Sequence, residues 1–122
     1  MSPMPDERPD AAQLIDRVRA IALEFPDVTE KLSHGEPAFF VKKRMFLTID
    51  NHHHGSGHVA VWCKAPEGAQ QSLVAGDPTH FFVPPYVGTA GWLGIRLDSG
   101  LPWPVVGDLL RQAYDAVAAR RR

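Results

Sequence analysis

The spacing between apolar residues changes twice along this chain of 122 residues, and these changes limit the possible folds more than any other feature. From about Asp10 to Phe25, apolar side chains recur at the three- and four-residue intervals of one helical face. Between Phe39 and Lys64 the interval falls to two, which is typical of strands that bury one face. From about Pro104 to Ala119 the helical interval returns. The pattern therefore predicts a block of strands between two amphipathic helices.

Three antiparallel strands in succession are expected inside this block. The first contains Phe39 and Val41, the second places Met45, Leu47 and Ile49 on one side, and the third runs from His58 to Lys64. The consecutive bases Lys42, Lys43 and Arg44 lie at the turn between the first two strands. The loop 50–57 is rich in glycine, histidine and short polar residues, a composition that suits the second hairpin connection.

The chain after this block predicts a short helix and two more strands. Pro66 is placed to open the helix and Gly76 to close it with a left-handed residue. A brief strand over His80–Val83 ends at two prolines, which exclude a central position. A clearer strand over Gly91–Asp98 places alternate apolar residues on one face.

Together these elements predict an α+β fold, in which an antiparallel β-sheet is packed by an N-terminal helix, a short middle helix and a C-terminal helix. Residues 10–119 are expected to form a single domain, between a disordered tail over 1–9 and a basic tail over 120–122. A content of 44% hydrophobic and 22% charged residues agrees with a folded chain rather than a disordered one.

Two further observations restrict the cellular setting. The single cysteine, Cys63, excludes internal disulfides and zinc sites built from cysteine pairs. The longest apolar runs are far shorter than the ~20 residues of a membrane helix, and the polar, proline-containing start does not resemble a signal peptide. We therefore expect a cytoplasmic protein that does not enter the membrane and exists as a monomer or weak dimer.

The net charge of −1 hides an uneven distribution. Residues 37–64 carry four bases against one acid, and residues 111–122 again carry four bases against one acid. Each segment is therefore +3, whereas the rest of the chain is acidic. Any attraction to nucleic acid must come from these local clusters and not from the total charge.

Three strings in this order resemble the MmcQ/YjbR family of small bacterial proteins, over roughly residues 12–118. They are Ser33-His34-Gly35-Glu36-Pro37-Ala38-Phe39, the hairpin Lys42-Lys43-Arg44-Met45-Phe46, and Gly91-Trp92-Leu93-Gly94-Ile95-Arg96-Leu97 before a helix with Tyr114. The resemblance implies a CyaY-like fold, similar to a double-wing DNA-binding motif. It implies no catalytic residues, and the label of DNA binding that such proteins carry rests on structural likeness.

The leading functional hypothesis is DNA binding by a basic β-hairpin. Lys42, Lys43 and Arg44 at the hairpin turn would neutralise phosphates, and Arg96 would join them from a neighbouring strand. The tail Arg120–Arg122 would add charge. The competing structural explanation is that lysines at a hairpin turn are simply solvated.

The alternative hypothesis is a small planar ligand bound in an aromatic cleft on the sheet. If part of one sheet face stays open, aromatic side chains next to a histidine and an arginine would line a concave, mostly apolar site. The candidate residues are His34, Trp62, Tyr86, Trp92 and Arg96. The competing explanation is that these aromatics belong to the core.

We expect no enzyme activity, no cofactor and no physiological metal. His34 and Glu36 offer a general base and acid, but such a short string more often serves a turn. Cys63 falls in an alternating buried strand, where a thiol is inert. The loop histidines His52–His54 with His58 would need further ligands to close a metal site, so whether they bind metal stays open.

Overall fold

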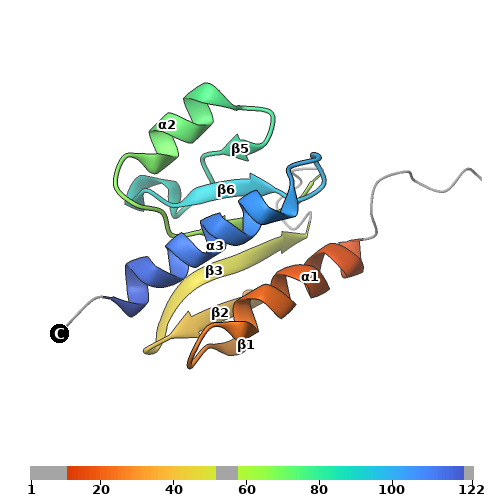
Figure 1. Cartoon of the computed structure of the whole chain (residues 1–122), viewed down its shortest axis with the longest axis vertical. Coiled ribbons are helices and arrows are strands. Elements are labelled where there is room, and N and C mark those ends of the chain that lie inside the picture. The colour runs from red at the N-terminus through yellow and green to blue at the C-terminus, as the bar shows by residue number, and fades with distance from the viewer. Residues whose placement is uncertain (1–10, 52–57, 120–122) are drawn as a thin grey trace, which may run out of the picture.

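The computed structural model describes residues 11–51 and 58–119, and Figure 1 shows its elements. In chain order they are α1 (Ala11–Glu24), β1 (Thr29–Ser33), β2 (Glu36–Val41), β3 (Arg44–Asn51), β4 (Val59–Cys63), α2 (Ala69–Gly76), β5 (Phe81–Phe82), the 3-10 turn η1 (Gly88–Ala90), β6 (Leu93–Arg96) and α3 (Trp103–Ala118). Across the described residues the strands form one antiparallel sheet in the order β1-β2-β3-β4-β6-β5. The predicted α+β class is therefore confirmed.

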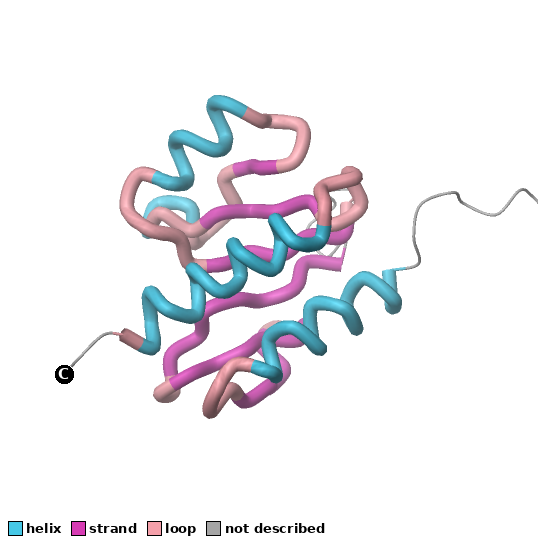
Figure 2. Tube along the Cα trace, viewed as in Figure 1, coloured by secondary structure: helices cyan, strands magenta, loops and turns pink. Residues whose placement is uncertain are grey.

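The two long helices lie side by side across one face of the sheet, as Figures 1 and 2 show. Their apolar stripes point at the strands: α1 buries Leu14, Val18 and Ala22, and α3 buries Val106, Leu110, Ala113, Tyr114 and Val117. The facing strand residues, such as Leu47, Val61 and Ile95, are almost fully buried. Each such side chain contributes about 1.5–3 kcal/mol on burial, so this layer holds most of the stability.

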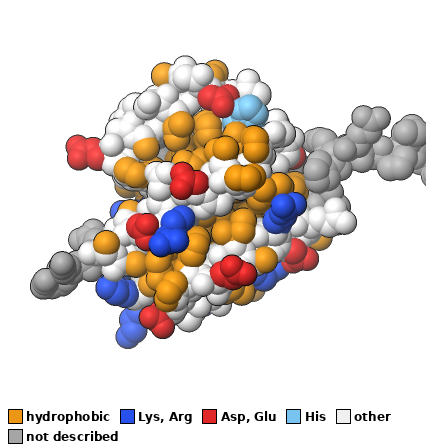
Figure 3. All heavy atoms as spheres, in the orientation of Figure 1, with side chains coloured by type: hydrophobic (Ala, Val, Ile, Leu, Met, Phe, Trp, Pro, Cys, Tyr) orange, Lys and Arg blue, Asp and Glu red, His pale blue; other side chains and the backbone are white. Residues whose placement is uncertain are grey.

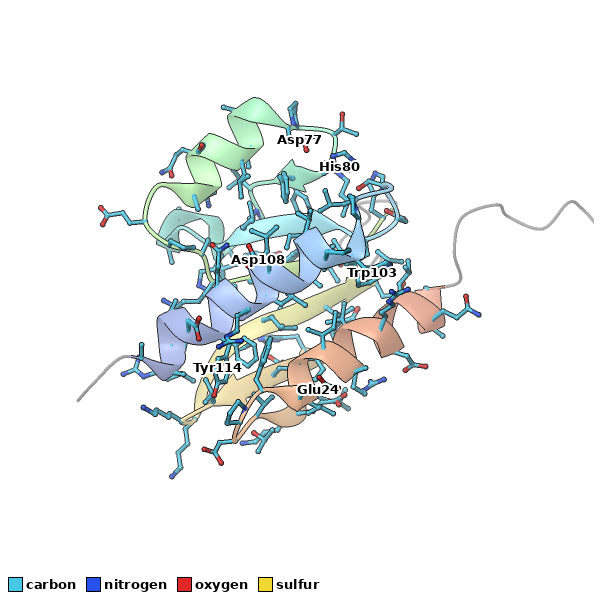
Figure 4. All side chains as sticks on the ribbon, viewed as in Figure 1. Glu24, Asp77, His80, Trp103, Asp108 and Tyr114 are labelled. Atoms are coloured by element: carbon cyan, nitrogen blue, oxygen red, sulfur yellow. The ribbon has the colours of Figure 1, made fainter. Side chains whose placement is uncertain are left out.

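An aromatic cluster fixes one end of this layer. The Tyr114 ring lies 4.9 Å from the Phe25 ring and 5.6 Å from the Phe46 ring, measured between centroids. Its hydroxyl donates a hydrogen bond of 2.8 Å to the Pro26 carbonyl. Figure 4 shows Tyr114 near the C-terminal end of α3, facing the sheet. The cluster therefore joins the end of α1, the start of β3 and α3.

The strand β1 is not predicted by the sequence pattern. Its residues alternate irregularly between exposed and half-buried positions, because it lies at the edge of the sheet. An ion pair attaches it to α1: the Arg19 guanidinium donates to both oxygens of Glu30 at 2.9 and 3.1 Å from Nε. This hydrogen bonding raises the pKa of Arg19.

A β-bulge changes which way Met45 points. Phe39 pairs with Leu47 but Phe40 pairs with Met45, so Phe46 is an extra residue on β3. Leu47 and Ile49 face the helices as predicted, whereas Met45 moves to the opposite face and Phe46 joins the core. The expectation that Met45 shares the side of Leu47 and Ile49 is therefore wrong.

The short middle helix is present, but its ends differ from the prediction. It begins at Ala69 and not at Pro66, because the left-handed Gly68, with a φ of 85°, precedes the first helical residue. Gly76 is its last helical residue and supplies no left-handed cap; the Asp77 N–H donates to the Leu73 carbonyl instead. The brief strand after it is shorter than predicted and lies at the other edge of the sheet.

Candidate functional site

The predicted basic hairpin exists, and its turn has an unusual backbone. Lys42 and Lys43 are the two residues between β2 and β3, with φ values of 53° and 66°. Positive φ at both central positions is typical of a type I′ turn, where Asn-Gly is the favoured sequence. Side chains with a Cβ rarely adopt this conformation, and each such residue costs about 1–3 kcal/mol. Lys42, Lys43 and Arg44, which we call the hairpin tip, are all exposed.

Lys42 also contacts the end of α3. Its Nζ donates a hydrogen bond of 2.8 Å to the Ala118 carbonyl, in the last turn of that helix. A cation is favourable there because the C-terminal carbonyls of a helix carry partial negative charge. The bond places the hairpin tip beside the point where the chain continues toward Arg120–Arg122, which lie outside the described residues.

A fourth base, Lys64, lies at the same end of the sheet. It directly follows β4, and its backbone N–H donates to the Phe46 carbonyl at 3.0 Å, two residues from Arg44. Lys64 is one of the four bases within residues 37–64, but the sequence pattern does not assign it to the site. Antiparallel pairing of two consecutive strands brings the end of the second beside the start of the first. The predicted pairing of these two strands is therefore a sequence signal that places Lys64 near Arg44.

Arg96 lies far from the hairpin tip. It pairs with Ala60, which pairs with Asp50, six residues along β3 from Arg44. At ~3.4 Å per strand residue this separation is roughly 20 Å along the sheet. The structure therefore does not bring Arg96 into one surface with the tip.

The Arg96 side chain is instead used to hold the loop before β5. Its Nη1 donates to the carbonyls of Pro78 and Thr79 at 3.0 and 3.3 Å, and its guanidinium stacks 4.8 Å from the Phe82 ring centroid. In the same loop, His80 Nδ1 lies 2.8 Å from an Asp77 oxygen, a pair visible in Figure 4. These contacts give Arg96 a structural role.

A hollow of about 410 Å³ opens on the sheet face turned away from α1 and α3. Three of the five residues predicted for an aromatic cleft line it: His34, Trp62 and Tyr86. The Trp62 and Tyr86 ring centroids are 6.5 Å apart. Trp62 is 7% exposed and Tyr86 is 79% exposed, so one ring forms a wall and the other projects from the surface.

The other two predicted residues lie elsewhere. Arg96 holds the loop described above, and Trp92 is absent from the described lining of the hollow. Trp92 is 7% exposed, and its carbonyl accepts a hydrogen bond of 2.6 Å from the buried Gln70 side chain of α2. Trp92 is therefore buried, and its backbone is held to α2 by this bond.

Two carboxylates that the ligand hypothesis did not include also line the hollow. Glu36 opens β2 and Asp50 lies near the end of β3, where it is only 3% exposed. No lysine or arginine is found among the lining residues that the structure describes. The strand register that joins Thr48 to Trp62 places these side chains together, and this register could not be read from the sequence.

The remaining candidate groups do not form a reactive site in the described part of the chain. Burial raises the pKa of the Cys63 thiol to about 12, so the thiol stays protonated and inert at neutral pH. No cluster of three metal-ligating side chains occurs among residues 11–51 and 58–119. The loop histidines His52–His54 lie outside these residues. No helix among them is long and apolar enough to cross a membrane.

The face that bears the helices carries charges of both signs. Figure 3 shows lysine and arginine side chains interspersed with aspartate and glutamate there. Such a surface does not concentrate positive potential in one region. The hairpin tip and the hollow are therefore the two features that stand out for binding.

Comparison with known proteins agrees with this fold. A family model described as YjbR matches residues 23–116, well over half of the chain. Among solved structures, the Deinococcus radiodurans protein DR2400, described with the domain DUF419, is similar with a TM-score of 0.75. The two are 21% identical, and the match covers 87% of this chain and 79% of that one. No curated protein matches the sequence.

Proposed function

This chain belongs to the YjbR family, and from that premise we propose that it is a non-enzymatic binding protein that contacts the phosphate backbone of DNA through its hairpin tip. Lys42, Lys43 and Arg44 supply the contacts, and Lys64 extends them along the same end of the sheet. Such contacts fix a protein on the duplex without reading its sequence.

The observation that supports this proposal most is the identity of the two turn residues. A two-residue turn with positive φ at both positions favours Asn-Gly, yet Lys42 and Lys43 occupy it. Two exposed lysines there place positive charge at the turn, at a cost in backbone strain. Lys42 keeps two further N–H donors beyond its bond to the Ala118 carbonyl, so it can still meet a phosphate.

The test is a pair of double variants that remove equal charge. Lys42→Asn/Lys43→Gly neutralises the turn with its preferred residues, and Arg17→Gln/Lys31→Gln removes two exposed bases from α1 and β1. Fluorescence anisotropy of a labelled random-sequence duplex at low salt gives the affinity of each. We expect the turn variant to bind at least about ten-fold more weakly than the wild type, because two counterion-releasing contacts are lost.

The matched control decides what a loss means. If Arg17→Gln/Lys31→Gln weakens binding as much as the turn variant, total charge and not the hairpin tip is responsible. If the wild type itself binds no duplex at low salt, the proposal of DNA contact is overturned.

The second candidate function is binding of a small planar ligand in the hollow. It is favoured by one observation: His34, Trp62 and Tyr86, chosen for this role by sequence, line the same hollow. Its volume of about 410 Å³ lies within the range of small-molecule sites. Because Trp92 lies outside the hollow, Tyr86→Ala is the informative variant; Tyr86 is exposed, so its removal should leave the fold intact.

A further inference from the structure

A partly exposed pair of apolar residues lies at the base of the hairpin tip. Phe40 of β2 pairs with Met45 of β3, next to the pair of Val41 with Arg44 that leads into the turn. Neither Phe40 nor Met45 is fully buried, and neither belongs to the described core cluster or packs against it. The two side chains therefore form apolar surface directly beside the three exposed bases of the tip.

This pair lies on the sheet face turned away from α1 and α3. Phe39 and Val41, the neighbours of Phe40 in β2, belong to the core, so Phe40 points to the other face. Met45 points the same way, because directly opposite residues of antiparallel strands share a face. Since both long helices lie across the opposite face (Figure 2), they do not cover Phe40 or Met45.

The Phe40 ring can be approached from solvent. The Lys31 Nζ lies 5.4 Å from the ring centroid, and Lys31 is an exposed residue of the edge strand β1. A cation–π contact at an exposed site is weak, so a planar group with a larger contact area can replace the ammonium on the ring. The adjacent Glu30 is turned toward α1, where its carboxylate accepts hydrogen bonds from Arg19.

We propose that Phe40 and Met45, together with the hairpin tip, bind single-stranded DNA, with one base stacked on the Phe40 ring and the neighbouring phosphates on the tip. This inference rests on the proposed function and names the form of DNA that uses the whole site. Proteins that bind single strands combine basic groups along the backbone with aromatic rings on which bases stack. Inside a duplex the neighbouring base pairs cover both faces of a base, so only an unpaired strand can use the ring.

The experiment compares two labelled DNAs of equal length, an oligothymidylate, which forms no duplex, and the same random-sequence duplex as above. Fluorescence anisotropy of the full chain with each DNA, across a salt series, gives the affinity and its salt dependence. We expect the wild type to bind both, because both carry phosphates for the tip. The contribution of the ring should be confined to the oligothymidylate.

Replacement of Phe40 measures this contribution. Phe40→Leu removes the ring and keeps an apolar side chain, so it should weaken oligothymidylate binding by at least about five-fold, the lower end of the effect of stacking one base. It should leave duplex binding unchanged. Its salt dependence should equal that of the wild type, because a stacked ring releases no counterions. Phe40→Tyr keeps a ring and should bind both DNAs as the wild type does.

Trp103→Leu is the matched control. Trp103 is another partly exposed ring with a cation over it, since the Arg17 guanidinium lies 4.7 Å from the ring centroid. It belongs to α3, on the opposite face of the sheet. Trp103→Leu should bind both DNAs with the affinity of the wild type. Thermal melting of each variant confirms that it is folded, so that a loss of binding can be assigned to the surface.

The outcomes separate this inference from the proposed function. Oligothymidylate binding that is unaffected by Phe40→Leu, or weakened equally by Phe40→Leu and Trp103→Leu, overturns stacking on Phe40 and leaves phosphate contact by the tip in place. Duplex binding without oligothymidylate binding by the wild type does the same. If the wild type binds neither DNA, both proposals are overturned.

Discussion

Arg96 illustrates how the role of one side chain depends on its neighbours in space. In the sequence it stands in a strand as an unpaired base, and we predicted that it would join the hairpin in contacting DNA. In the fold its guanidinium donates to the Pro78 and Thr79 carbonyls and stacks on Phe82. Contacts between residues 14 to 18 positions apart are not visible in local sequence patterns, so this role required the structure.

This assignment predicts a stability defect without a binding defect. Arg96→Gln should lower the free energy of unfolding by about 1–3 kcal/mol, because hydrogen bonds from a charged donor are lost. Urea denaturation measures this change, and duplex titration should give the affinity of the wild type. An unchanged unfolding free energy together with weakened duplex binding would restore Arg96 to the DNA-contacting surface.

Cys63 supplies a second prediction at the residue scale, through pH. Burial raises the pKa of its thiol from 9.0 to about 12, so between these values the unfolded chain loses a proton that the folded chain keeps. The contribution of the buried, protonated thiol to the free energy of unfolding is therefore fully present below pH 9. It decreases by about 1.4 kcal/mol per pH unit as the pH rises toward 12.

A thiol-free variant isolates this effect. The stability of the wild type relative to Cys63→Val should decline between pH 9 and pH 10.5, as measured by urea denaturation. Iodoacetamide at pH 8 should label the thiol in denaturant but not in the folded protein. Rapid labelling of the folded protein would show that Cys63 is accessible and that the core is not closed over it.

At the scale of elements, predictability follows from burial. The helices α1 and α3 each bury one continuous stripe, so their periodicity gave their ends within two residues. The edge strand β1 buries little on either side and carries no such signal. The bulge at Phe46 reverses the side of Met45, because one extra residue shifts a period of two. Local pattern thus identifies the elements with a buried face, whereas bulges and edges depend on pairing.

The hairpin between β2 and β3 makes the most distinctive prediction at this scale. Lys42→Asn/Lys43→Gly should raise the free energy of unfolding by about 1 kcal/mol, since Asn and Gly adopt positive φ more readily than lysine. The lost bond from Lys42 to the Ala118 carbonyl is exposed and offsets only part of this gain. Urea denaturation of the variant and the wild type measures the difference. A marked loss of stability would show that the lysines serve the fold and not a ligand.

At the scale of the whole molecule, the sheet carries the hairpin tip at one end and the hollow on the face turned away from α1 and α3. The sequence located the hairpin bases and three residues of the hollow, because strings near turns and alternating aromatics are local features. It did not assign Lys64, Glu36 or Asp50 to these sites. Their positions depend on the pairing of β3 with β2 and β4, and Asp50 lines the same hollow as Trp62 only through that register. The register of the strands thus decides which residues gather at each of the two sites.

The central claim is that the hairpin tip contacts DNA phosphates, and the salt dependence of duplex binding tests it most directly. The logarithm of the binding constant falls with the logarithm of salt concentration by about 0.9 per phosphate contact. Fluorescence anisotropy across a salt series should therefore give a slope that is shallower by about 2 for Lys42→Asn/Lys43→Gly than for the wild type. Identical slopes for the two proteins would contradict the claim.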